Sequence, residues 1–191
     1  NIATNMKDVE VQEVIWEPSM HWYLNPTLRI KPTKLSGVTV TYVTAHNAKY
    51  VWDNGIGKGA IIKIVRSGDV IPYIVDIVKP CKRADMPDID YMWNETEVDI
   101  IIVDPTPDVK RIVNIKRNLH FFRVLGVKFL SDGLITKFYD EGYDTVCKIL
   151  TAASERDVAP YTVDGLGQIM VTKIYDQIDK AMKNVKLENL M

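Results

Sequence analysis

An arginine stands beside a break in a β-rich part of the chain, within the stretch Arg66-Ser67-Gly68-Asp69-Val70-Ile71-Pro72. Residues 60–65 and 70–78 on either side have the composition of strands, whereas Gly68 and Asp69 are typical of a tight turn or bulge. Because Pro72 lacks a backbone N–H group, it favours a strand edge. The stretch therefore predicts a hairpin that presents a cation to a binding partner. A purely structural hairpin is the alternative.

Residues for covalent chemistry are missing from the sequence. A nucleotidyl-transfer enzyme needs a lysine nucleophile in a Lys-x-Asp-Gly-type motif, together with carboxylates for a metal ion. The sequence contains no such motif, no Walker-type phosphate loop, no dinucleotide-binding glycine fingerprint and no paired carboxylates of a nuclease. We therefore expect no catalytic residue in this chain.

Two further segments accompany the Arg66 stretch. Arg29, Pro32 and Gly37 follow the pattern Arg-x-x-Pro-x-x-x-x-Gly, and a short β-rich run then ends in His46-Asn47. No segment is specific alone, but together, in this order and spacing, they resemble the oligonucleotide-binding (OB) domain of bacterial-type NAD-dependent DNA ligases. The resemblance makes His46-Asn47 a structural pair at the start of a helix.

The pattern of strands and helices predicts an α+β chain with three parts. Residues 1–80 are expected to form a five-stranded OB-fold β-barrel that binds DNA, because short strands with one helix between the third and the fourth match that fold. Residues 81–116 are expected to form a linker, and residues 117–191 an all-α helix-hairpin-helix domain that also binds DNA. The predicted elements of the first part are strands at 9–16, 28–35, 38–43, 60–65 and 70–78 and a helix at 47–53.

The linker contains two β-rich runs, at 98–103 and 109–115, separated by Asp104-Pro105-Thr106-Pro107-Asp108. We predict an antiparallel β-hairpin with a proline-stiffened loop. In the ligase family this position holds a four-cysteine zinc knuckle, whereas the only cysteines here are Cys81 and Cys147. We therefore expect the hairpin to replace the knuckle, with no zinc, in a viral or phage branch of the family. Two separate thiols are expected, with a disulfide as the alternative.

The last part of the chain is helical. Its predicted helices, from the spacing of apolar residues, are 118–125, 132–139, 144–150, 154–158 and 168–182. Val163-Asp164-Gly165-Leu166-Gly167 has the apolar-x-Gly-apolar-Gly pattern of a helix-hairpin-helix. Its glycines allow positive φ and leave backbone N–H groups free to hold a phosphate, which fixes position on DNA and not sequence. A tight helix–helix connection is the alternative. Leu125-Gly126-Val127-Lys128-Phe129 resembles a second, degenerate copy.

Basic residues accompany both DNA-binding parts. Residues 109–131 contain no acidic residue, which favours contact with a DNA backbone over the alternative of a solvated helix face. Arg29 and Lys31 belong to a cationic strip on a barrel strand. No metal ligand is expected. The residues expected to bind DNA are Arg29, Lys31, Arg66, Gly68, Asp69, Val70, Ile71, Arg117, Arg123, Gly126, Lys128, Gly165, Gly167 and Lys173.

The resemblance implies the nick-clamping, DNA-binding part of an NAD-dependent DNA ligase, which seals 5′-phosphate/3′-hydroxyl nicks in replication and repair. NAD and Mg²⁺ would be bound by an adenylation domain that carries the lysine nucleophile, so this chain alone would be inactive. The implied partners are nicked double-stranded DNA and that adenylation domain or subunit. The alternatives are a non-catalytic OB/helix-hairpin-helix module for single strands or junctions, and a protein-interaction barrel with no DNA role.

The composition is that of a globular protein. The 191 residues are 47% hydrophobic with a net charge of −1, so net charge does not by itself indicate a nucleic-acid partner. No apolar run approaches a membrane span, and the polar amino terminus does not resemble a signal peptide. We expect a soluble cytoplasmic protein of a bacterium or an infected host cell. The missing initiator Met and the end within a helical run predict a fragment of a longer protein or one subunit of a split enzyme.

Overall fold

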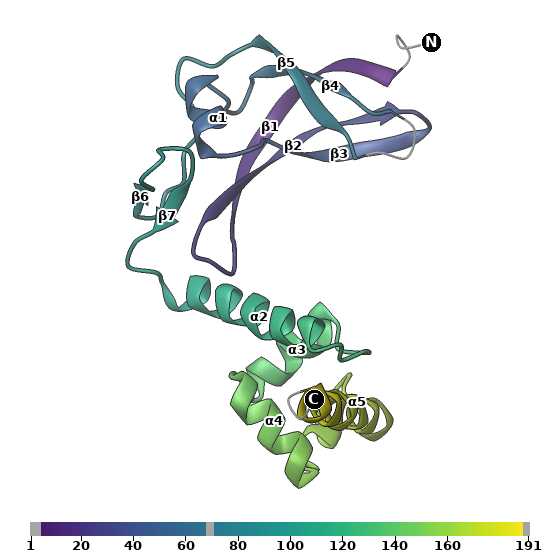
Figure 1. The fold of residues 1–191 in the computed structure, drawn as a ribbon. Coiled ribbons are helices and arrows are strands. Elements are labelled where there is room, and N and C mark those ends of the chain that lie inside the picture. Colours follow the sequence, from purple (N-terminus) through teal and green to yellow (C-terminus); the bar gives the residue numbers. More distant parts are fainter. Residues whose placement is uncertain (1–4, 68–70, 189–191) are drawn as a thin grey trace. The chain divides into compact units, whose positions relative to one another are not determined.

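The computed structural model describes residues 5–67 and 71–188, and the chain divides into two compact units, residues 1–105 and 106–191. We call them the sheet unit and the helical unit. Their boundary divides the predicted linker, so residues 81–105 belong to the sheet unit and residues 106–116 to the helical unit. The elements of the sheet unit are β1 (Met6–Pro18), β2 (Leu24–Leu35), β3 (Val38–Thr44), α1 (Ala48–Asp53), β4 (Ile61–Val65), β5 (Tyr73–Lys79), β6 (Tyr91–Trp93) and β7 (Ile100–Ile102) (Figure 1).

A five-stranded antiparallel sheet dominates the sheet unit, in the order β3-β2-β1-β4-β5. These strands, with α1 between the third and the fourth, confirm the predicted OB-fold elements. The long β1 pairs first with β4 and then with β2, and a register shift between Val11 and Glu13 lets one strand serve both halves of a bent sheet. Alternate residues of β2, such as Leu28 and Ile30, are fully buried in the same core as Ile62 of β4.

The predicted five-stranded β-barrel is not closed among the described residues. β3 and β5 are the two ends of the strand order, and no hydrogen-bonded ladder joins them within residues 5–67 and 71–188. The structure is therefore an OB-type sheet with two edges. Closure requires strands whose edges meet in register. The alternation of apolar residues predicts which face of a strand is buried, but it carries no information about what lies against its edge.

The predicted hairpin of residues 98–103 with 109–115 is wrong. The linker does contain a two-stranded antiparallel sheet, but β6 and β7 form it, and residues 109–115 lie in a helix. Thr106 begins this helix, because its side chain accepts a hydrogen bond from the Val109 N–H group at 3.4 Å, and Pro107 occupies the first turn. These two start signals and the tertiary packing outweigh the strand preference of the β-branched residues that follow.

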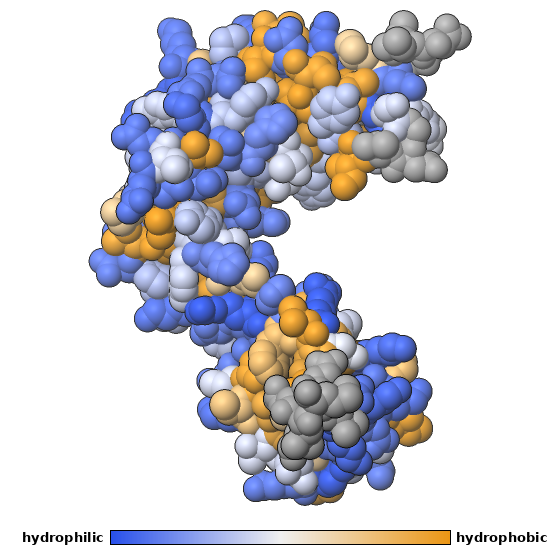
Figure 2. Space-filling view, viewed as in Figure 1, coloured by the Kyte–Doolittle hydropathy of each residue, from blue (hydrophilic) through white to orange (hydrophobic). Residues whose placement is uncertain are grey.

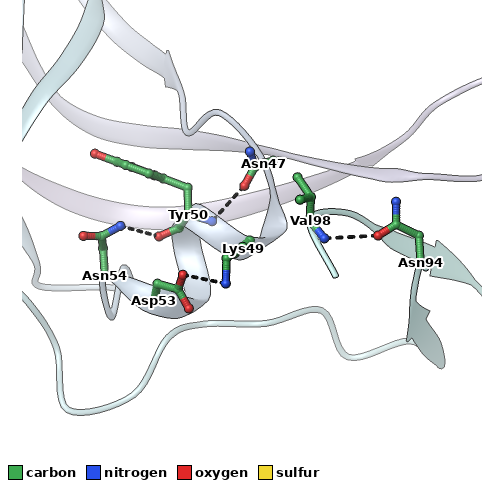
Figure 3. A network of polar contacts seen from close by, with 7 residues as sticks. All are labelled: Asn47, Lys49, Tyr50, Asp53, Asn54, Asn94 and Val98. Carbon is green, nitrogen blue, oxygen red and sulfur yellow. Dashed lines mark hydrogen bonds and ion pairs between the residues drawn. The ribbon is translucent and has the colours of Figure 1, made fainter. Parts of the chain in front are cut away.

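A turn around Asn94 attaches the β6–β7 hairpin to α1 (Figure 3). The Asn94 Oδ1 atom accepts a hydrogen bond from the Val98 N–H group at 3.1 Å. The Val98 carbonyl in turn accepts a hydrogen bond at 3.0 Å from the N–H group of Lys49, which lies in the first turn of α1 and has no partner within that helix. Trp52 of α1 meets Trp93 of β6 edge to face, with ring centroids 6.3 Å apart. Direct side-chain and backbone contacts therefore hold the hairpin against α1.

Helix α1 confirms the expected start at His46-Asn47. The Asn47 Oδ1 atom accepts a hydrogen bond from the Tyr50 N–H group at 2.8 Å (Figure 3), and the His46 ring lies edge to face against Tyr50. Asn54 ends the helix and donates from its side chain to the Tyr50 carbonyl at 2.9 Å. Gly55 follows with φ +57°, as expected after a helix end.

The helical unit contains α2 (Pro107–Val124), α3 (Asp132–Asp140), α4 (Val146–Glu155), the 3₁₀ helix η2 (Ala159–Thr162) and α5 (Gln168–Glu188). Four of the predicted helices correspond to α2, α3, α4 and α5, with longer bounds for α2 and α5 and a later start and end for α4. The short helix predicted at 154–158 is wrong, because Ser154 continues α4 and Arg156, at φ +52°, ends it. Phe122, Phe138 and Tyr175 are fully buried in one apolar core. No helix among the described residues is long and apolar enough to cross a membrane.

Candidate nucleic-acid interface

Arg66 lies directly after β4 and beside the turn that joins β2 to β3, at the end of the sheet away from α1 (Figure 1). Its Nη1 atom donates to the Ser36 carbonyl at 3.4 Å, and the Ser36 Oγ atom lies 3.3 Å from the Arg66 carbonyl oxygen. Folding thus brings together two predicted motif segments that are 30 residues apart in the sequence. Arg66 is half-buried and, within the described residues, has no ion pair, so its charge can meet a phosphate.

The predicted DNA-facing turn continues beyond Arg66. Gly68, Asp69 and Val70 lie outside the described residues, so their role stays a prediction. Ile71 comes next and is 77% exposed. Val75 and Val78 of the edge strand β5 are exposed as well, with Val78 toward the start of β4 and away from Arg66, and Figure 2 shows apolar residues gathered on one part of the sheet unit. Apolar side chains beside a cation are typical of surfaces that enter the minor groove.

Arg29 and Lys31 of β2 differ in their surroundings. The Arg29 Nε atom donates to Glu13 Oε2 of the neighbouring strand at 3.2 Å, so a carboxylate on β1 offsets its charge. Lys31 is exposed and has no ion pair in the part of the chain that the structure describes. Lys31 is therefore better placed than Arg29 to contact a phosphate.

The basic run of α2 is partly neutralised by α3. Arg111 forms two hydrogen bonds with Asp140, at 2.9 and 2.8 Å, and Arg123 pairs with Asp132 at 3.7 Å. The sequence window lacks acidic residues, but the fold supplies them from the next helix. Arg117 is exposed and forms no ion pair with any described residue, so no described carboxylate competes with a phosphate for it.

The first of the two glycine loops in chain order, residues 125–129, contacts helix α5. Gly126 has φ +83°, and the space where a Cβ atom would lie is open. Lys173 of α5 places its Nζ atom 5.8 Å from the ring centroid of the exposed Phe129. The Lys128 N–H group donates to Gln177 Oε1 of the same helix at 3.4 Å. Three predicted DNA-binding residues, Gly126, Lys128 and Lys173, therefore lie near one another on the helical unit.

The second glycine loop, residues 163–167, is held by a lysine from α3. Gly165 and Gly167 have φ +80° and +61°, and Gly167 directly precedes α5. Lys137 donates from Nζ to the Asp164 carbonyl at 3.1 Å, and a Cβ atom at Gly165 would lie 1.7 Å from that Nζ atom. Lys137 was not among the predicted site residues. It lies 27 residues before Asp164, and no local pattern links the two.

Asp157 connects α4 to α5 and so supports the second loop. The Tyr143 hydroxyl donates to its Oδ2 atom at 2.6 Å, and the Tyr175 hydroxyl donates to its carbonyl at 2.9 Å. Burial and the bond to Asp157 raise the pKa of Tyr143 to about 12, so this hydroxyl stays protonated and keeps donating. The same bond lowers the pKa of the Asp157 carboxyl. The arrangement joins helices and offers no group poised for proton transfer.

Acid is expected to weaken the helical unit. Hydrogen bonds from Arg111 and Tyr143 lower the pKa values of Asp140 and Asp157, respectively, below the ordinary value of 3.8. Such carboxyls contribute stability that is complete above the unfolded pKa and is lost as the pH falls through the folded pKa. Urea unfolding followed by circular dichroism should show a midpoint that drops below about pH 4. The drop should be smaller in Asp140→Asn, and a midpoint that holds down to about pH 2 would contradict the assignment.

The described residues offer no metal centre. Within 5–67 and 71–188, no three histidine, cysteine, aspartate or glutamate side chains are grouped to hold an ion. Cys81 and Cys147 are free thiols, which confirms the expectation of two separate cysteines.

Comparison with known proteins gives matches over most of the chain. Residues 4–86 match the family described as the NAD-dependent DNA ligase OB-fold domain. The chain is 41% identical over 96% of its length to a DNA ligase of Acanthamoeba polyphaga mimivirus, and 34% identical over 90% to a putative DNA ligase of Invertebrate iridescent virus 3. It is 30% identical over 76% of its length to a DNA ligase of Desulfatibacillum aliphaticivorans. The chain spans 28%, 22% and 23% of these relatives, about a quarter of their length.

Proposed function

Residues 4–86 belong to the OB-fold domain family of NAD-dependent DNA ligases, and from this premise we propose that the chain is the DNA-binding part of such a ligase and clamps nicked duplex DNA. Its similarity to viral ligases over 90% or more of its length supports a viral member of the family. The enzyme would seal nicks during replication and repair in the cytoplasm of a bacterium or an infected cell.

The position of Arg66 carries this proposal. Its guanidinium has no carboxylate partner among the described residues and lies beside the β2–β3 turn. The exposed Ile71 comes two residues before Tyr73, which pairs with Val65, the neighbour of Arg66. An arginine binds phosphate through a planar, two-pronged donor, and an adjacent apolar side chain can enter the minor groove. The sheet unit would therefore grip the duplex at the nick through its backbone and shape, independently of sequence.

The helical unit would supply a second grip as a helix-hairpin-helix domain. Gly126 and Gly167, both at positive φ, have nothing within 4 Å of where a Cβ atom would lie, so a phosphate can approach their backbone, whereas the Lys137 ammonium fills that space at Gly165. Lys128 and Lys173 lie beside the first loop. Backbone contacts of this kind hold the flanking duplex without reading its bases.

The bond-forming chemistry would reside in an adenylation domain or subunit. That domain would bind NAD and Mg²⁺ and supply the lysine that carries AMP to the 5′-phosphate. The residues present here do not fit either group, because the sequence has no Lys-x-Asp-Gly motif and the described residues contain no grouped acidic ligands. The task of this chain is to hold and orient the nick.

A non-catalytic module for single strands or junctions is the second candidate. Tyr42 of β3 and Tyr73 of β5 are 55% and 47% exposed, and exposed aromatic rings on an OB-type sheet can stack unpaired bases. This function would need no adenylating partner.

Binding of the chain to a nicked duplex, an intact duplex and a single strand of equal length distinguishes the two candidates. We expect the nicked duplex to bind most tightly, and its affinity to fall with salt with a slope of about −0.9 per phosphate contacted. Equal or tighter binding of the single strand would favour the second candidate. Binding to none of the three at low salt would refute both.

A further inference from the structure

The turn between β2 and β3 contains a residue that is poorly suited to it. Leu35 pairs with Val38, and the two residues between them, Ser36 and Gly37, have φ +49° and +76°. A two-residue hairpin with both φ values positive favours Asn-Gly or Gly-Gly. A residue other than glycine is strained in this conformation, because its Cβ atom comes close to the following carbonyl oxygen. The local geometry therefore does not explain a serine at position 36.

Contacts with distant residues do explain the serine. Its Oγ atom lies 2.7 Å from Asn5 Oδ1 and 3.3 Å from the Arg66 carbonyl oxygen, which are 31 and 30 residues away in the sequence. The Arg66 N–H group donates to the Asn5 carbonyl at 3.0 Å, and Arg66 Nη1 donates to the Ser36 carbonyl. Ser36, Asn5 and Arg66 therefore form a closed ring of hydrogen bonds between the β2–β3 turn, the start of β1 and the end of β4.

We propose that Ser36 is a positioning residue for Arg66. The serine strains the turn, but its hydrogen bonds hold the arginine in place at the proposed DNA-binding surface. The inference rests on the proposed function. Residues that hold an unfavourable backbone conformation, stabilised by contacts with distant parts of the chain, are often functional. The hydroxyl donates to the Asn5 side chain, the Asn5 carbonyl accepts from the Arg66 N–H group, and the Ser36 carbonyl accepts from the Arg66 guanidinium. An arginine restrained in this way loses less conformational freedom when it meets a phosphate.

Two substitutions at position 36 separate positioning from stability. Ser36→Gly relieves the strain and removes the hydroxyl, so we expect near-wild-type urea unfolding but binding to nicked duplex weakened roughly three- to tenfold, the size of one hydrogen bond. Ser36→Thr keeps the hydroxyl but adds a β-branched side chain at positive φ. It should lower the unfolding midpoint while keeping nicked-duplex affinity within about twofold of wild type at a temperature where the protein is folded. If Ser36 had only a structural role, the nicked-duplex affinity would change in the same direction as the urea unfolding midpoint in both variants.

A double-mutant cycle then tests whether Ser36 acts through Arg66. Ser36→Gly should have no further effect on nicked-duplex binding in the Arg66→Ala background. Equal loss in both backgrounds, or binding that follows stability, would overturn the inference. If Arg66→Ala weakens binding and Ser36→Gly does not, the inference fails and the proposed function stands. If the wild-type chain shows no preference for nicked duplex, or Arg66→Ala changes nothing, the DNA contact itself is wrong and the inference falls with it.

Discussion

Replacing Arg66 with alanine is expected to weaken binding to a nicked duplex by roughly 10- to 100-fold, the range for hydrogen bonds to charged groups. The guanidinium has no carboxylate partner within the described residues, so its removal leaves no buried charge behind in the free protein. The loss should therefore appear in binding and not in folding. Fluorescence anisotropy with a labelled nicked duplex measures the affinity, and urea unfolding checks that the sheet unit is intact.

Two control variants distinguish a specific contact of Arg66 from a general effect of charge. Arg66→Lys keeps the charge but removes the planar donor, so it should recover only part of the affinity. Arg83→Ala removes the same kind of charge, an exposed guanidinium, from the same unit but outside the predicted interface. It should change affinity only slightly. If Arg83→Ala weakens binding as much as Arg66→Ala, the contact is a general charge effect and not a site.

Replacing Gly55 with alanine is expected to destabilise the sheet unit by about 2–5 kcal/mol, from a strained φ and an overpacked contact together. Gly55 has φ +57°, and a Cβ atom there would lie 2.7 Å from the Cys81 carbonyl oxygen. That oxygen is main chain and cannot turn away, and the Cys81 N–H group also donates to the Gly55 carbonyl at 2.8 Å. A loss of this size is a large part of the stability of a small domain.

Gly59→Ala is the matched control for Gly55→Ala. Gly59 also has positive φ, at +91°, but nothing lies within 4 Å of where its Cβ atom would be. Gly59→Ala should lower the free energy of unfolding only through the strained φ, by about 1–2 kcal/mol. Urea unfolding followed by tryptophan fluorescence compares the two, because Trp52 lies in the helix that ends just before Gly55. If both variants lose the same stability, the close contact with the Cys81 carbonyl does not contribute to the destabilisation of Gly55→Ala.

The OB part of the fold could be predicted because its signals are local. The cap at Asn47 and the end at Asn54-Gly55 define α1 within a few residues, and alternation defines β2 and β3. The linker could not be predicted in the same way. Val109 and its β-branched neighbours favour a strand by composition, whereas Thr106 and Pro107 start a helix. Packing of that helix into the core decides between these preferences.

The candidate site shows the same division. The types and order of residues around Arg29, His46 and Arg66 sufficed to predict a ligase-like OB domain, because family motifs and turn chemistry lie in short stretches. The contact of Arg66 with DNA stays a prediction. Which cations stay free could be decided only by the tertiary structure. Ser36 restrains Arg66 and Asp140 neutralises Arg111, across 30 and 29 residues. Ion pairs and side-chain hydrogen bonds depend on distances in space, and a local sequence pattern does not determine the distances between residues far apart in the chain.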